Sequence, residues 1–276
     1  MEAANHGGSA ASDLHLRSPM DAMGARSGFR TFEWLGELAL LTGRTARAAV
    51  RPPYEVRELL RHMDEVGSKS APLVAVAGAA IGVVLTLETR NSLVSFGAES
   101  ALPAIITISV IRETGPIITA LIASGRVGAG FAAAIGSMRV TEQIDALEVS
   151  GVDPYKYLIA TRTIACALML PLLTLICDAA AIVTGWIVNT LSNPISLTLF
   201  LERGFRSVTF SDLFPPTFKT MVFGIIIAVV SGLQGMNARG GTAGVGRAVT
   251  NAVVLSSILV IIADVVLVRL ILTFFP

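Results

Sequence analysis

Charged residues are scarce in this sequence, and those present are unevenly distributed. Only 15% of the residues are Asp, Glu, Lys or Arg, whereas 53% are hydrophobic. Soluble domains usually contain about 25% charged residues. Residues 1–69 hold 18 of the 41 charges, and the remaining 207 residues hold 23. The composition therefore predicts a membrane protein with a polar N-terminal segment.

Lysine, cysteine and net charge are also low, and each excludes a class of function. There are three lysines and no G-x-x-x-x-G-K-[ST] phosphate loop, so we do not expect the chain to hydrolyse ATP itself. A formal net charge of +1 leaves no basic surface for nucleic acid. The two cysteines, Cys166 and Cys177, share one apolar run and are expected to be packing residues. No spacing indicates a disulfide framework, a metal site or a catalytic triad.

Long apolar runs are abundant. A spanning helix needs about 20 mostly apolar residues, and in lipid only helices or closed barrels satisfy their backbone hydrogen bonds. The runs here are too long and too uniformly apolar for barrel strands. We therefore predict an all-α polytopic membrane protein with five transmembrane helices, at about 71–89, 101–124, 163–190, 217–236 and 248–274.

Basic residues between the runs predict the orientation. With a cytoplasmic N-terminus, segments 1–69, 126–162 and 234–247 are cytoplasmic and carry 15 of the 21 Lys and Arg residues. The outer segments then carry only four, which are Arg90, Arg203, Arg206 and Lys219. The positive-inside rule favours this orientation, with the C-terminus on the outer side.

The polar N-terminal segment is expected to have two parts. Residues 1–28 are small and polar without an apolar signal region, so we expect a disordered tail and no cleaved signal. Residues 29–65 combine aromatic residues and leucines with arginines, which is typical of a helix lying in the cytoplasmic interface. The Pro52-Pro53 pair is expected to interrupt that helix. A soluble helical hairpin is the alternative.

Two charges and a Gly-Pro step occur midway through the second apolar run, in the sequence R-E-T-G-P at 112–116. Each charge at the bilayer centre costs roughly 2.5–3.5 kcal/mol on insertion scales, and Pro116 cannot continue an ideal helix. Irregular backbone at this depth is tolerated only inside protein or beside a watery cavity. Arg112, Glu113, Gly115 and Pro116 are therefore candidates for a cavity site.

Other charges within the runs leave alternatives open. Arg112 and Glu113 would have a structural role alone if they neutralised each other or Asp178. Asp264 and Arg269, in the last run, are further possible partners, because charges in spanning helices usually face the bundle interior. Intramembrane carboxylates are also what a proton-coupled secondary transporter requires. That function, and a non-transporting membrane scaffold, are the alternatives to ATP-driven transport.

Glycines at helical spacing predict close helix packing. Small residues allow two helix backbones to approach each other, and the positions concerned are Gly78, Gly82, Gly125, Gly128 and Gly136. A phosphate-binding interpretation of residues 124–130 is weak, because no strand precedes them. As one helix, residues 101–138 would be about 57 Å long, so this segment must extend beyond the bilayer core or break.

An acidic segment follows, at residues 141–150. Its pattern predicts a helix that Gly151 ends. Glu142, Asp145 and Glu148 recur at every third residue, next to an anionic leaflet that repels them. They are expected to face a basic partner, and a separate ATPase subunit would bind here if ATP drives transport. A solvated loop helix is the alternative.

Several stretches together form a specific signature. They are R-E-T-G-P at 112–116, G-R-V-G at 125–128, I-G-S-M-R-V-T-E-Q-I-D-A-L at 135–147, V-D-P at 152–154, G-G at 240–241 and V-G-R at 245–247. Through them the sequence resembles the MlaE family of ABC transporter permeases, over about residues 30–275.

The resemblance implies a homodimeric five-span permease with an N-terminal interfacial helix, in the inner membrane of a diderm bacterium. It implies movement of phospholipid or a related lipid between the inner and outer membranes. The implied partners are ABC subunits that bind ATP and Mg, and an MCE-domain protein on the outer side. Glu113 matches the motif's acidic residue near the lipid cavity. The implied coupling helix comprises Glu142, Gln143, Ile144, Asp145, Leu147 and Glu148.

Two positions depart from the family pattern. Ala134 stands where the family usually has Glu, which removes a charge near the cytoplasmic end of the second long helix. Glu88 stands where the family usually has Gln, which adds an ionisable group near Arg90 at the outer end of the first run. Glu88 is expected to face the outer mouth of the cavity or to reach the headgroups.

Overall fold

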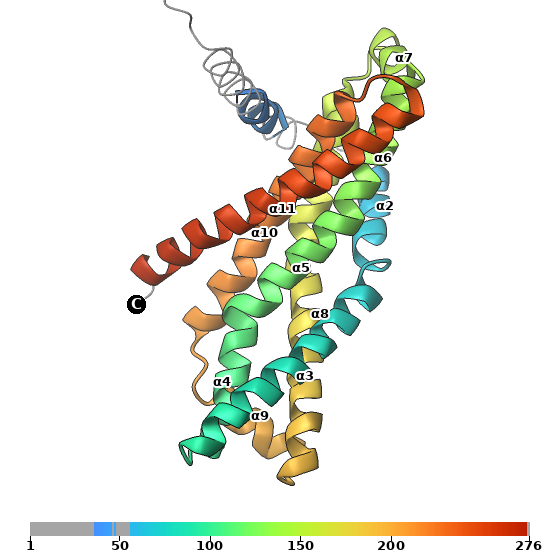
Figure 1. Cartoon of the computed structure of the whole chain (residues 1–276). Coiled ribbons are helices and arrows are strands. Elements are labelled where there is room, and N and C mark those ends of the chain that lie inside the picture. The colour runs from blue at the N-terminus through green and yellow to red at the C-terminus, as the bar shows by residue number, and fades with distance from the viewer. Residues whose placement is uncertain (1–35, 46, 48–55, 275–276) are drawn as a thin grey trace, which may run out of the picture. The chain divides into compact units, whose positions relative to one another are not determined.

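All regular structure in the described part of the chain is helical (Figure 1). The computed structural model describes residues 36–45, 47 and 56–274. Residues 1–40 and 41–276 form two separate units, and the second contains nearly all of the described structure. The expected tail at 1–28 and the expected break at Pro52-Pro53 lie outside the described residues. The expected interfacial segment is helical where it is described, at residues 36–45, at residue 47 and in α2 (Val56–Gly67).

Five helical segments are long and apolar enough to cross a membrane, which confirms the predicted class and number of spans. The first consists of α2 and α3 (Ala71–Ser95). The second runs through η1 (Glu99–Ala101), α4 (Leu102–Ser109), η2 (Val110–Thr114), α5 (Gly115–Ala123), η3 (Ser124–Gly128) and α6 (Ala129–Val140). The other three contain η4 (Tyr155–Ala160) with α8 (Thr161–Ser192), α10 (Phe210–Met236) and α11 (Gly241–Phe274).

Two short helices lie between the long ones, at opposite ends of the bundle. The helix α7 (Gln143–Val149) follows α6, and α9 (Leu197–Phe205) precedes α10. Figure 1 shows α7 at one end and α9 at the other. The positive φ of Gly151, 78°, ends α7 where the sequence predicted a stop. Ser196 caps α9, because its Oγ accepts a hydrogen bond from the Leu199 N–H at 3.3 Å.

The second long segment continues past Gly115 and Pro116, where the sequence suggested a break. The five residues of η2 form a π turn, in which the Gly115 N–H donates to the Val110 carbonyl. A π turn has one residue more than an α turn, and the wider turn accommodates the proline ring that an ideal helix excludes. A second π turn, η3, lies farther along. The segment therefore extends toward α7 as an irregular but continuous helix.

Helix α8 is central to the core and packs against α2, α3, α5 and α10. A Cβ at Gly78 would meet the backbone of Cys177, and one at Gly82 would meet the backbone of Ala181. These two glycines therefore allow α3 and α8 to make backbone contact. Cys177 and Cys166 are free thiols buried in this core.

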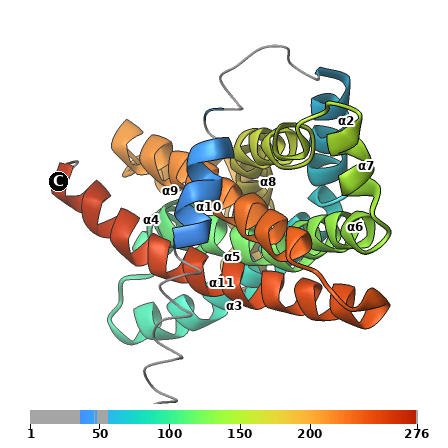
Figure 2. The ribbon, with the colours of Figure 1, turned by 90° about the horizontal axis from the view of Figure 1, so that it is seen from above.

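Helices α6, α10 and α11 form the other half of the packing, and Figure 2 shows α6 and α11 side by side. A Cβ at Gly128 would lie 2.9 Å from Ser231 Oγ, and one at Gly136 would lie 3.3 Å from the Ala238 Cβ. Gly125 differs, since nothing lies within 4 Å of its Cβ position. Among the described residues of one copy, Gly125 therefore makes no close helix contact of the kind expected from its spacing.

Candidate functional site

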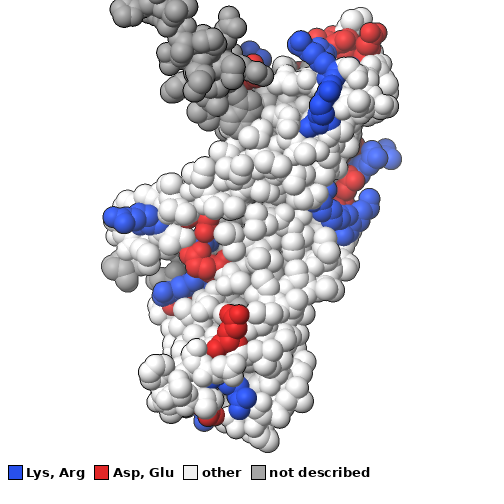
Figure 3. Space-filling model, viewed as in Figure 1, with Lys and Arg blue, Asp and Glu red and all other residues white. Residues whose placement is uncertain are grey.

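Charged side chains are concentrated in a few places on the surface. Figure 3 shows red side chains gathered at the end that carries α7, and a wide surface without charge below it. A mixed red and blue group interrupts that surface on the left, over α10 and α11. In this region one pocket is lined by charged residues of η2 and α10 and by apolar residues of α10 and α11.

Arg112, on the π turn η2, pairs with Asp212 in the first turn of α10. Its Nε donates to Asp212 Oδ1 at 2.9 Å, and its Nη2 donates to the same oxygen. Asp212 also caps α10, because the Thr209 backbone N–H donates to Asp212 Oδ2 at 2.8 Å. One carboxylate therefore holds both the start of α10 and the Arg112 guanidinium.

Glu113 pairs with a different residue of α10, Lys219. Lys219 Nζ lies 2.9 Å from Glu113 Oε2 and 2.9 Å from Asp264 Oδ1 of α11. Lys219 is only 3% exposed, although the sequence interpretation counted it among the outer basic residues. Lys219 lies inside the protein and not on an outer segment, because two carboxylates offset the desolvation of its ammonium group.

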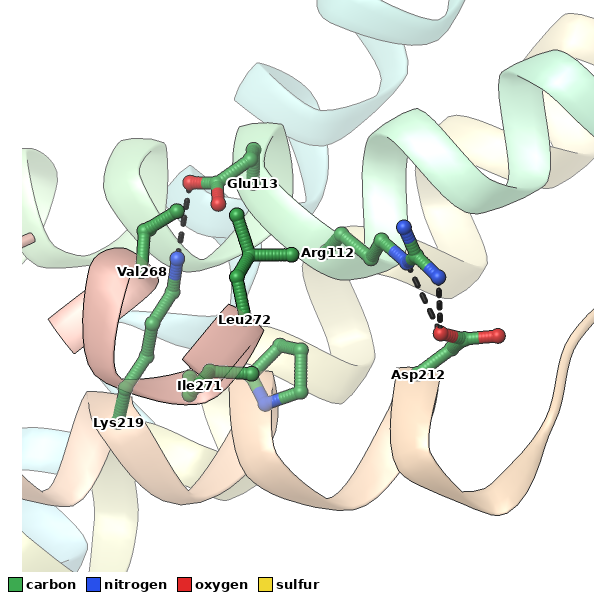
Figure 4. A pocket seen from close by; sticks show the side chains of 8 residues that line it. Arg112, Glu113, Asp212, Lys219, Val268, Ile271 and Leu272 are labelled. Carbon is green, nitrogen blue, oxygen red and sulfur yellow. Dashed lines mark hydrogen bonds and ion pairs between the residues drawn. The ribbon is translucent and has the colours of Figure 1, made fainter. Parts of the chain in front are cut away.

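Figure 4 shows how adjacent residues on η2 reach separate partners: Arg112 points toward Asp212, and Glu113 toward Lys219. The side chains of Arg112 and Glu113 remain 47% and 46% exposed, whereas that of Lys219 is 2% exposed. The site thus has an accessible charged layer with a buried ion pair between Lys219 and Asp264 behind it.

The pocket between these residues is small and has two kinds of wall. Its polar wall is the charged group, and its apolar wall is Pro216 with Val268, Ile271 and Leu272. A cavity volume of about 40 Å³ has room for a few water molecules. An accessible guanidinium can donate to a phosphate, and an accessible carboxylate can accept from an ammonium group. The site can therefore bind a polar group that carries both charges beside apolar chains.

The sequence identified part of this site. Arg112 and Glu113 were expected there, and Asp264 was flagged as a buried partner, but Asp212 and Lys219 were missed. Their spacing was a usable signal: Asp212 and Lys219 are seven residues apart, and residues at that spacing lie on the same face of a helix. Lys219 was instead assigned to the outer basic residues, and Asp212 precedes the fourth apolar run, so the sequence predicted neither residue in this site. Asp178, proposed as a partner of Arg112, makes no ion pair among the described residues.

The remaining cavity candidates lie elsewhere. Gly115 faces α8, where a Cβ would collide with Asp178 Oδ1. Pro116, next along α5, is buried and does not line the pocket. Glu88 is exposed on α3 and likewise does not line it. Arg269 is exposed on α11. Among the described residues, no group of three or more His, Cys, Asp or Glu side chains is placed to hold a metal ion.

The acidic segment at 141–150 is shorter as a helix than its pattern suggested. Glu142 precedes α7 and has a left-handed backbone, with φ of 61°, because only two residues connect α6 to α7. Ile144 is buried. Asp145 is in an ion pair with Arg139 at 2.5 Å.

The outward surface of α7 is formed by the remaining residues. Gln143 and Glu148 are exposed, and Leu147 is partly buried. Val149 is 91% exposed, which adds an apolar contact that the acidic pattern alone did not predict.

The fold and the site define a polytopic membrane protein with a charged pocket among its spanning helices, a class to which transport subunits belong. Residues 59–270 match the model of the family described as Permease MlaE, so the chain belongs to the MlaE permease family. This confirms the family resemblance found in the sequence. A permease acts in transport, not in catalysis.

Curated relatives agree with the family assignment. A probable ABC transporter permease protein of Rickettsia felis is 36% identical over 236 residues, which cover 86% of this chain and 91% of that protein. A probable ABC transporter permease protein of Synechocystis is 35% identical over 233 residues, covering 84% and 89%. The chloroplastic protein TRIGALACTOSYLDIACYLGLYCEROL 1 of Arabidopsis thaliana is 32% identical over 235 residues, covering 85% and 67%. The chain is thus an ABC transporter permease.

Proposed function

We propose that this permease moves phospholipid or a related lipid between the inner and outer membranes, driven by ATP hydrolysis in a separate subunit. The observation that carries the proposal is the mixed-charge pocket beside an apolar wall. Arg112 and Glu113 are accessible, while Lys219, which is itself paired with Asp264, holds the carboxylate of Glu113 in place from behind. A zwitterionic headgroup offers a phosphate to Arg112 and an ammonium group to Glu113.

The pocket is too small to hold a whole lipid by itself. A cavity of about 40 Å³ does not hold a whole lipid, whose acyl chains need far more room than a few water molecules. We propose that a second permease copy completes the cavity, with the acyl chains lying between the two copies. The plant relative, whose name contains trigalactosyldiacylglycerol, supports a glycerolipid as the class of substrate.

ATP must come from a partner in this proposal, because the chain has no phosphate loop. The exposed end of α7, with Glu142, Gln143, Glu148 and Val149, is the proposed contact for an ABC subunit that binds ATP and Mg. Leu147 and the buried Ile144 would support that contact from within α7. This places the α7 end and the N-terminus in the cytoplasm and the C-terminus in the periplasm. An MCE-domain lipid-binding protein would bind at the α9 end.

The proposal is tested with the permease and its ATPase subunit in proteoliposomes that contain a labelled phospholipid. We expect lipid movement to require ATP and to fall in Glu113→Gln, which keeps the side-chain size but removes the charge. Glu99→Gln is the matched control, because Glu99 is an exposed glutamate that accepts a hydrogen bond from Asn193 and does not line the pocket. Lipid movement driven by a pH gradient without ATP would support the proton-coupled alternative instead.

A further inference from the structure

A buried carboxyl group without a partner lies on α8. Asp178 is 4% exposed, and neither of its carboxylate oxygens has a hydrogen-bond partner among the described residues. An ionised carboxylate in this position would be strongly destabilising, because no described group replaces its lost hydration. An unpaired charge inside a protein costs several kcal/mol in general. The neutral carboxylic acid avoids that cost.

Among the described residues, no charged group on a neighbouring helix forms an ion pair or a hydrogen bond with Asp178. Arg112 and Glu113 of η2 are paired with Asp212 and Lys219 of α10. Helices α4 and α5 contain no titratable residue. The part of α3 that contacts this level of α8 consists of small and apolar residues, since Gly78 and Gly82 lie against Cys177 and Ala181. Glu88 is six residues beyond Gly82, about 9 Å along the helix.

What Asp178 does contact is the backbone at Gly115, where the π turn η2 ends and α5 begins. A Cβ at Gly115 would collide with Asp178 Oδ1, and the Val110 carbonyl oxygen is 3.1 Å from that Cβ position. The Asp178 Oδ1 and the Val110 carbonyl oxygen therefore both lie next to the Cβ position of Gly115. The Val110 carbonyl already accepts from the Gly115 N–H and has a second lone pair. Pro116 supplies no N–H, so the turn has fewer donors than carbonyl acceptors.

We infer that Asp178 is a protonation site: it carries a proton as a neutral carboxylic acid, and its O–H donates to a carbonyl oxygen of the π turn η2. A carboxylate would repel that carbonyl, whereas the acid binds it. Asp178 is in this way a positioning residue, because η2 is the turn that carries Arg112 and Glu113 into the pocket. The inference depends on the proposed function only where lipid movement is measured.

Infrared difference spectroscopy of the purified full-length chain in lipid tests the protonation directly. We expect wild type to show the C=O stretch of a protonated carboxylic acid near neutral pH, and Asp178→Asn to lose it. Asp64→Asn is the matched control, because Asp64 is an exposed aspartate on α2, and it should leave the band unchanged. If the spectra of wild type and Asp178→Asn do not differ in this band, the inference is overturned, whatever the protein transports.

Lipid movement tests the positioning role. Asn is neutral, has nearly the same shape and keeps a donor, so Asp178→Asn should retain lipid movement within about twofold of wild type. Asp178→Ala removes the donor and should lower lipid movement by about tenfold or more. Equal loss in both variants, with the infrared band present in wild type, would keep the protonation but overturn the positioning role. Wild-type protein that moves no lipid contradicts the proposed function, and the spectroscopic result still decides the protonation.

Discussion

Lys219 offers a direct test of the pocket's electrostatics. The Lys219→Met variant keeps the length and apolar stem of the side chain but removes the ammonium group. Lys219 Nζ is 2.9 Å from both Glu113 Oε2 and Asp264 Oδ1. The variant therefore leaves Asp264, which is 8% exposed, as a buried carboxylate without its partner.

The expected cost follows from the burial of this pair. Removing one partner of a buried ion pair typically destabilises a protein by about 3–5 kcal/mol, because the other charge stays buried. A second substitution, Asp264→Asn, removes the uncompensated charge and should restore most of that loss. The coupling in a double-mutant cycle is then expected to be about 3 kcal/mol, at the upper end of the range for residues in contact. The free energy of unfolding of the purified permease in detergent, measured with denaturant, provides all four values.

A matched lysine shows whether the effect is specific. Lys69 is exposed, and its Nζ is 3.9 Å from Glu65, so Lys69→Met should change the unfolding free energy by no more than about 0.5 kcal/mol. If Lys219→Met were as mild as Lys69→Met, the buried ion pair would not contribute as argued. Failure of Asp264→Asn to compensate would show that the loss arises from side-chain packing.

Three further predictions concern helix packing, the α7 end and the start of α10. Gly115→Ala should destabilise the protein by about 1–3 kcal/mol through overpacking against Asp178. Gly125→Ala should change stability by less than about 1 kcal/mol, and thermal unfolding measures the stability of both variants. Replacing Glu142 and Glu148 together with Lys should weaken ATPase binding by about tenfold or more without changing the unfolding temperature, and unchanged binding in a pull-down would exclude α7 as the electrostatic contact. Asp212→Ala should cost about 0.5–2 kcal/mol by loss of the α10 cap alone, and a cost near zero in denaturant unfolding would mean that the cap contributes nothing.

The charged residues of the pocket show how far the sequence alone could predict the site. Arg112 and Glu113 were identifiable because a charge within an apolar run needs a compensating partner. Asp264 was identifiable for the same reason, but its partner was not. Lys219 was assigned to an outer segment, because hydropathy near the end of a run does not tell a buried ammonium from an exposed one. Pairing across 106 residues, as between Lys219 and Glu113, has no local signal.

The π turn η2 could likewise be predicted only in part from the sequence. The proline at 116 predicted an irregular backbone, and the structure has one. Whether the helix breaks or widens depends on what its neighbours can accommodate, and Gly115 against Asp178 is a tertiary contact. The same holds for α7, whose acidic pattern predicted a helix. Its exposed surface was decided by the burial of Ile144 and the ion pair of Asp145 with Arg139.

The sequence by itself determined the all-helical class, the five spans and the family, because apolar run length and motif spacing are local properties of the chain. Only the tertiary structure decided which charges meet. Ion pairs form where helices far apart in sequence approach each other, and that approach depends on packing contacts such as Gly78 and Gly82 against α8. The pocket is therefore a property of the assembled helices, although its first two charged residues can be found in the sequence.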